Sequence, residues 1–138
     1  MTTAQLNMID APNSVPVRPA QLRPDVPHAY IGGDIDVVTA AQLLATMPEL
    51  KVLDVRTPVE HGEGRIRGDL NLDFYADEFA DQLAGLDREA YYLIYCRCGG
   101  RSGMTISFMR DLGFRHLIHM PAGIEGWVAA GLPIQSDR

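Results

Sequence analysis

The stretch that decides the fold reads Tyr91-Tyr92-Leu93-Ile94-Tyr95-Cys96-Arg97-Cys98-Gly99-Gly100-Arg101-Ser102. Its first five residues are apolar or aromatic, which is typical of a buried strand. The two glycines then allow a tight turn. After the turn, apolar residues recur at helical spacing, at Met104, Phe108, Met109 and Leu112. We therefore expect a strand, a short loop and a helix that ends with Gly113 as its C′ residue.

Strand and helix signals alternate along the chain from Ile35 onward. Short apolar runs predict strands at 37–38, 51–55, 70–72 and 116–119. Helical spacing and end signals predict helices at 40–47, behind a Thr39 cap, and at about 75–86 and 124–130. This alternation predicts an α/β fold with a mainly parallel central sheet and helices on both faces. The loop at Cys96 then lies at the carboxyl end of a strand, where such sheets place their sites.

Composition predicts one globular domain that acts on neither nucleic acid nor membranes. The chain has 138 residues, 46% hydrophobic and 22% charged, which is enough for one core. Its net charge of −6 argues against nucleic acid and anionic membranes as partners. We find no secretory signal pattern. Two cysteines separated by a single residue are poorly placed for a stapling disulfide, so we expect a cytoplasmic protein with free thiols.

Prolines set the N-terminal segment apart from the rest of the chain. Residues 1–28 contain five of them, Pro12, Pro16, Pro19, Pro24 and Pro27, without strand or helix periodicity. Such a segment is either disordered or an extended strip lying on the domain. We therefore predict a Pro-rich extension at 1–28 and a folded domain at 29–138.

The loop combines features that lower the pKa of a thiol. Arg97 and Arg101 bring positive charge, and the following helix adds the partial charge of its N-terminus. Gly99 and Gly100 allow positive φ and converging N–H groups. We predict that Cys96 is the nucleophile. Substrate would bind the rest of the loop, namely Arg97, Cys98, Gly99, Gly100, Arg101 and Ser102.

Two plainer interpretations of the loop stay open. The cysteines could be small residues in a tight turn, or they could form a Cys-x-Cys metal clip. His116 and His119 are the nearest further ligands in the sequence, but their spacing on a strand points them to opposite faces. We expect no metal and no cofactor. No histidine lies within the loop itself, so an imidazole neighbouring in sequence does not account for thiol activation.

Four segments, in order, resemble the single-domain rhodanese family of sulfurtransferases. They are 52–56 (Val-Leu-Asp-Val-Arg), 60–72, the loop with its preceding tyrosine at 95–102, and 122–127 (Ala-Gly-Ile-Glu-Gly-Trp). The resemblance implies a rhodanese-like α/β domain in which Cys96 carries sulfur as a persulfide. It implies a small-molecule donor such as thiosulfate and an acceptor such as cyanide, a thiol or a protein thiol. Two half-reactions then predict ping-pong kinetics.

The resemblance leaves other functions to be separated. Cysteine phosphatases and related arsenate reductases place arginine after five intervening residues, whereas Cys96 and Arg101 have four between them. A catalytically silent domain that binds a protein is a further alternative, against which the intact Cys96 argues. Cys98 stands where the family has serine, and it could accept sulfur, form a disulfide or be passive.

Several matched residues have structural interpretations. We expect Asp54 and Arg56 to brace the loop or a neighbouring turn, and Trp127 to anchor the core. The sequence also departs from the family pattern, with His61 for an aromatic residue, Arg65-Ile66-Arg67 for His-Ile-Pro, and Ala122 for glycine. These departures affect fine packing more than the fold.

Overall fold

The computed structural model describes residues 33–137 of the chain. Within that range, four strands form one parallel sheet in the order β2-β1-β3-β4. The strands are β1 (Leu50–Asp54), β2 (Leu70–Asn71), β3 (Tyr91–Tyr95) and β4 (His116–His119). This is the parallel α/β architecture that the alternation of signals predicts. The extension predicted at 1–28 lies outside the described residues.

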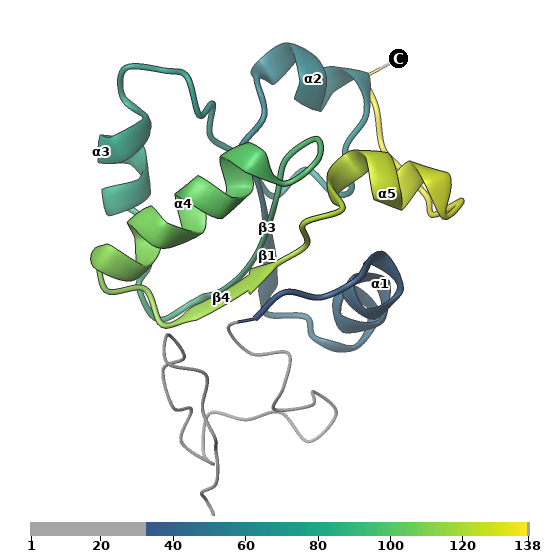
Figure 1. The fold of residues 1–138 in the computed structure, drawn as a ribbon, viewed down its shortest axis with the longest axis horizontal. Coiled ribbons are helices and arrows are strands. Elements are labelled where there is room, and N and C mark those ends of the chain that lie inside the picture. Colours follow the sequence, from purple (N-terminus) through teal and green to yellow (C-terminus); the bar gives the residue numbers. More distant parts are fainter. Residues whose placement is uncertain (1–32, 138) are drawn as a thin grey trace, which may run out of the picture.

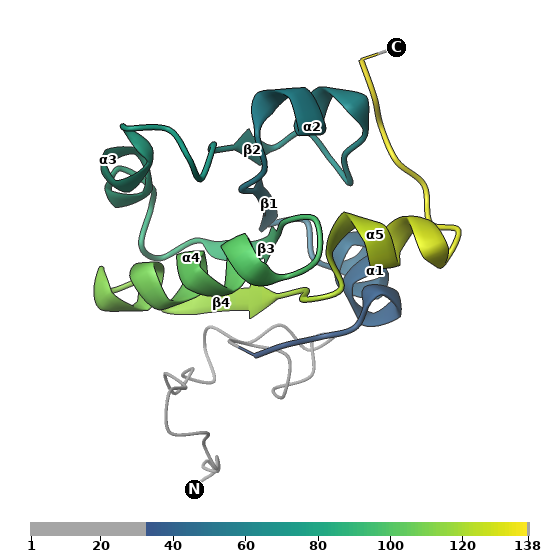
Figure 2. The ribbon, with the colours of Figure 1, turned by 45° about the horizontal axis from the view of Figure 1, so that its top comes forward.

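Helices cover both faces of the sheet, as Figures 1 and 2 show. One face carries α1 (Val37–Thr46) and α5 (Gly123–Ala129), and the other carries α3 (Phe79–Ala84) and α4 (Gly100–Asp111). A short helix, α2 (Pro58–Glu63), follows the carboxyl end of β1. The loop between β3 and α4 therefore opens at the same end of the sheet as α2 and the start of α5.

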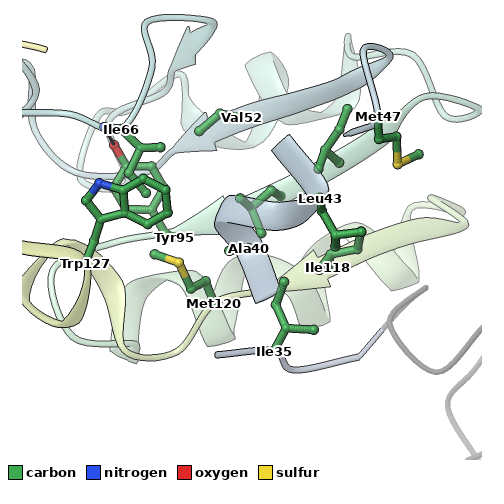
Figure 3. Packing of buried hydrophobic residues seen from close by; sticks show 12 residues of the cluster. Ile35, Ala40, Leu43, Met47, Val52, Ile66, Tyr95, Ile118, Met120 and Trp127 are labelled. Atoms are coloured by element: carbon green, nitrogen blue, oxygen red, sulfur yellow. Dashed lines mark hydrogen bonds between the residues drawn. The ribbon is translucent and has the colours of Figure 1, made fainter. Parts of the chain in front are cut away.

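Two apolar clusters hold these layers together. On the α1 and α5 face, Leu43 and Trp127 pack with side chains of the sheet such as Val52, and Figure 3 shows the indole of Trp127 beside Ile66 and Tyr95. Trp127 is thus a core residue, as predicted. Each such side chain contributes roughly 1.5–3 kcal/mol when fully buried.

β3 is buried on both faces, and this determines where Cys96 points. Leu93 and Tyr95 belong to the α1 and α5 cluster, whereas Ile94 and Cys96 belong to the α3 and α4 cluster. The two sets alternate because successive side chains of a strand point to opposite faces. The Cys96 side chain therefore lies on the face that α4 covers.

The start of α1 differs from the prediction. Residues 37–38, predicted as a strand, form the first turn of the helix. The Asp36 carboxylate accepts a hydrogen bond from the Thr39 N–H at 2.8 Å, so Asp36 is the N-cap and Thr39 the third helical residue. A capping bond at Asp36 stabilises the helix more than two β-branched residues favour a strand.

α2 was not predicted, although the sequence carries its signal. Thr57 caps the helix, Pro58 occupies its first turn, and Glu60 completes a reciprocal capping box. By themselves, Gly62 and Gly64 favour an irregular connection in this segment. Local capping at Thr57 therefore prevails over the low helix propensity of the glycine within the helix.

α4 is helical as predicted, but of the four apolar residues that indicate it only Met109 is buried. Met104, Phe108 and Leu112 are exposed, whereas Ser102, Thr105, Ile106 and Met109 are buried. The contact of Ser102 with the Cys96 sulfur fixes the rotation of the helix, so apolar spacing alone does not identify its inner face.

Candidate active site

Gly99 gives the loop its turn. Its φ is +105°, and a Cβ there would lie 2.7 Å from the Pro121 carbonyl oxygen. Both the backbone conformation and the close approach therefore require glycine. Gly100 is different, because it is the first residue of α4 and does not take positive φ. The sequence allows positive φ at both glycines; Gly99 takes it and Gly100 does not, since the helix starts immediately after the turn.

The first turn of α5 holds the loop in place. The Ile124 N–H donates to the Cys96 carbonyl at 2.9 Å, and the Glu125 N–H donates to the Arg97 carbonyl at 3.2 Å. Gly123 permits this approach, since it has a φ of +65° and a Cβ on it would overlap the Arg97 carbonyl. The loop carbonyls thus have partners on α5, and the loop N–H groups remain to face the thiol.

The Cys96 sulfur lies among hydrogen-bond donors. Its Sγ accepts the Gly99 N–H at 3.1 Å and the Ser102 N–H at 3.4 Å, and it lies 3.3 Å from the Ser102 Oγ. Burial raises the pKa of the Cys96 thiol, but hydrogen bonds from Ser102, Gly99 and Cys98 lower it by more. The pKa is therefore below its ordinary value, although only 1% of Cys96 is exposed.

Tertiary structure adds a histidine that the loop sequence lacks. The His119 Nε2 lies 2.8 Å from the Ser102 Oγ, and its Nδ1 lies 3.2 Å from Asp34 Oδ1. Burial lowers the pKa of His119, and Asp34 opposes that effect. The sequence suggested His119 only as a metal ligand. Its place at the carboxyl end of β4, next to β3, is the signal that could have found it.

The two arginines of the loop have different surroundings. Arg101 binds both carboxylate oxygens of Glu60, at 2.8 and 3.0 Å, and its guanidinium lies over the Tyr75 ring. This pairing holds the pKa of Glu60 at about 2. Arg97 is exposed and forms an ion pair with Glu125. Arg101 is thus built into the structure, whereas Arg97 is a surface charge beside the loop.

Comparison with known families settles what kind of domain carries this site. Residues 39–130 match the family described as "Rhodanese-like domain". The chain belongs to the rhodanese-like domain family.

Individual relatives agree with this assignment. A protein named "Sulfurtransferase" from Allochromatium vinosum is 29% identical over 101 residues, which cover 73% of this chain and 92% of that protein. "Protein HIGH ARSENIC CONTENT 1, mitochondrial" from Arabidopsis thaliana is 30% identical over 107 residues, covering 70% of this chain and 62% of that protein. Among solved structures, a rhodanese-related protein from Thermoplasma volcanium is 28% identical with a TM-score of 0.63, covering 74% of this chain and 96% of that one.

Asp54 and Arg56 of this rhodanese-like domain form a buried hydrogen-bonded network next to α2. Asp54 is fully buried and binds Arg56 at 2.7 Å, the Tyr95 hydroxyl at 3.0 Å and the His61 Nδ1 at 2.8 Å. Arg56 also donates to the Gly64 carbonyl at 2.7 Å. The pair therefore links the end of β1 to α2 and to the residue that follows it, and its supporting role for the loop or a neighbouring turn stays a prediction. His61, which departs from the family pattern, is part of this network.

The described part of the rhodanese-like domain contains neither a metal-binding cluster nor a membrane-spanning helix. Residues 33–137 contain no group of three or more side chains suited to hold a metal ion. His116 stacks on the Tyr91 ring, while His119 faces Ser102, so the two imidazoles lie in separate environments. No helix in this described range is long and apolar enough to cross a membrane.

Proposed function

We propose that this protein is a sulfurtransferase that carries sulfane sulfur on Cys96. The main support is the pair of hydrogen bonds that the Cys96 sulfur accepts. They come from the N–H groups of Gly99 and Ser102, at 3.1 and 3.4 Å. Donors aimed at one sulfur stabilise the negative charge of a thiolate before attack and of a persulfide after it. A lowered pKa also increases the fraction of Cys96 that is thiolate at neutral pH, and the thiolate is the form that attacks.

The reaction consists of two displacements. In the first, the Cys96 thiolate attacks the outer sulfur of thiosulfate, a new S–S bond forms, and sulfite leaves with the electrons of the donor's S–S bond. In the second, cyanide or a thiolate attacks the outer sulfur of the Cys96 persulfide. The product leaves as thiocyanate or as a new persulfide, and the Cys96 thiolate is restored.

The remaining loop residues have proposed roles around this sulfur. Gly99, Gly100 and Ser102 supply the backbone of the cradle, and Arg101 fixes its shape through Glu60. Arg97 would draw an anionic donor towards the loop, because it is exposed beside it. Cys98 is exposed and would be the first thiol that a transferred sulfur meets. A reducing, cytoplasmic setting with a protein thiol as acceptor is consistent with two free cysteines.

Intact mass after incubation with thiosulfate tests this function. The expected result is a gain of one sulfur atom that cyanide removes. The gain should be absent in Cys96→Ser and present in Cys98→Ser, which is the matched control two residues away. No gain with thiosulfate, a polysulfide or 3-mercaptopyruvate would contradict sulfur transfer through Cys96.

Arsenate reduction is a second candidate, because one relative is named for arsenic content. A cysteine at the start of an N–H-lined loop can also attack the arsenic atom of arsenate. The loop leaves only four residues between Cys96 and Arg101, which suits a sulfur atom better than a tetrahedral oxyanion. Thiol-dependent formation of arsenite from arsenate, with no thiocyanate from thiosulfate and cyanide, would favour this candidate.

A further inference from the structure

Four side chains form a continuous hydrogen-bonded row from the thiol to the surface. Cys96 Sγ lies 3.3 Å from Ser102 Oγ, which lies 2.8 Å from His119 Nε2. His119 Nδ1 lies 3.2 Å from Asp34, whose side chain is 73% exposed. Ser102 is fully buried, and His119 is buried as well. These residues come from the end of β3, from α4, from β4 and from the segment before α1, so the row exists only in the folded chain.

The number of protons in this row limits how it can be arranged. A serine hydroxyl has one proton, and a neutral imidazole donates from one nitrogen and accepts at the other. The Asp34 carboxylate favours a proton on the His119 Nδ1, which leaves Nε2 to accept the Ser102 hydroxyl. The Ser102 oxygen is then free to accept the S–H of Cys96. Thiol and neutral imidazole therefore satisfy every bond of the row.

The thiolate form also satisfies every bond, with its direction reversed. The Cys96 thiolate accepts a hydrogen bond from the Ser102 hydroxyl, so the Ser102 oxygen must in turn accept a hydrogen bond from the N–H at His119 Nε2. His119 then carries protons on both nitrogens and is an imidazolium facing Asp34. One shift of protons along the row converts the first form into the second and leaves no buried partner unsatisfied.

We propose that His119, oriented by Asp34, takes the proton of the Cys96 thiol through the Ser102 hydroxyl. The S–H bond of Cys96 breaks as a new O–H bond forms on Ser102, and the former Ser102 proton passes to His119 Nε2. Thiol and imidazole thus become thiolate and imidazolium without an external base. His119 acts through Ser102, so it is a positioning residue. This proposal concerns the same thiol that carries sulfur in the proposed function. The proton transfer does not depend on that function, and only its biological purpose rests on it.

The charges around the row are compatible with this role. Among residues 33–137, Asp34 is the charged group that faces the His119 ring. α4 presents the uncharged Ser102 and Gly103 to the ring, and β3 pairs the apolar Ile94 with His119. Arg101 interacts electrostatically with Cys96, and its charge favours the thiolate. Burial keeps His119 neutral in the resting state, which a proton acceptor requires.

Titration of the thiolate by its ultraviolet absorbance near 240 nm tests the proposal without any sulfur donor. A Cys98→Ser parent is used, so that Cys96 is the only thiol that titrates. Two coupled groups should give thiolate in two steps in the parent. His119→Gln keeps a polar group near Ser102 but cannot become a cation. We expect it to remove the lower step and raise the midpoint by about one pH unit.

The matched control is His116→Gln, on the same strand but outside the row, which should titrate like the parent. Asp34→Asn alters an exposed side chain, so it should fold, and we expect a smaller rise in the same direction. An unchanged titration in a folded His119→Gln or Asp34→Asn variant would overturn the proposal. Such an outcome leaves sulfur transfer untouched, because the mass experiment tests that separately.

Nuclear magnetic resonance of the histidine rings gives a second readout that requires no change at His119. Adding Cys96→Ser to the parent removes the thiolate that stabilises the imidazolium, so the pKa of His119 should fall. The His116 signals in the same spectra should not move. Identical His119 titrations with and without Cys96 would overturn the proposal.

Discussion

Arg101 and Glu60 form a two-point ion pair, with N–O distances of 2.8 and 3.0 Å. Glu60 is in turn fixed by the capping box of α2, where its carboxylate accepts the Thr57 N–H at 3.0 Å. The arginine that ends the loop is thereby attached to a helix on the other side of the site. Its charge is shared with Glu60, so the converging N–H groups are the main donors to the sulfur.

This attachment predicts different kinetics for the two loop arginines. Arg101→Ala should release the loop from α2 and lower kcat, because the Cys96 cradle loses its support. Arg97→Ala should mainly raise the KM for an anionic donor, since the Arg97 side chain is exposed and pairs with the surface carboxylate of Glu125. Steady-state rates over a range of thiosulfate concentrations measure both constants. Equal effects of the two variants would contradict this division.

The same ion pair predicts a pH dependence of stability. The pKa of Glu60 falls from 4.5 in the unfolded chain to about 2 in the folded protein. A lowered folded pKa contributes stability above pH 4.5, and this contribution is lost as the pH falls towards 2. Urea unfolding of the wild type and Glu60→Gln at several pH values measures it. The stability difference between the two should shrink below pH 4.5, and a constant difference would contradict the assignment.

Ser102→Ala should weaken the nucleophile. Its hydroxyl is within 3.3 Å of Cys96 Sγ, and hydrogen bonds to a thiolate lower the thiol pKa. Loss of this bond should raise the pKa of Cys96, so less thiolate is present at neutral pH. At a pH below the pKa of Cys96, each unit by which that pKa rises would reduce kcat/KM by about tenfold. The pH dependence of kcat/KM measures the new pKa. Thr105→Ser, one turn further along α4 and bonded to the Arg101 carbonyl, serves as the control.

Gly99→Ala and Gly100→Ala should differ, although the residues are neighbours. Alanine at 99 must adopt a φ of +105° and approach the Pro121 carbonyl. The strained backbone alone costs roughly 1–2 kcal/mol, so the free energy of unfolding should fall by at least that amount. At Gly100, a Cβ meets nothing within 4 Å, and the helical backbone favours alanine. Urea unfolding distinguishes the two, and equal losses would contradict this expectation.

Local sequence predicted the elements that are buried most completely. β3 and β4 have the predicted ranges, because a strand covered on both faces needs an apolar run that begins and ends abruptly. Gly113 has a φ of +95° after α4, as expected of a C′ glycine. The first turn of α1 was predicted wrongly, because the polar cap at Asp36 outweighs the preference of Val37 and Val38.

The sequence by itself predicted the α/β architecture, the loop and the choice of Cys96 as its candidate nucleophile, because these depend on neighbouring residues and their spacing. Only the tertiary structure decided what surrounds that cysteine. Parallel strands bring the ends of β3 and β4 together, so His119 reaches Ser102 across 17 residues and Asp34 reaches His119 across 85. Such distances in sequence leave no periodic signal. The cysteine is therefore evident in the sequence, and the groups that set its protonation are evident only in the fold.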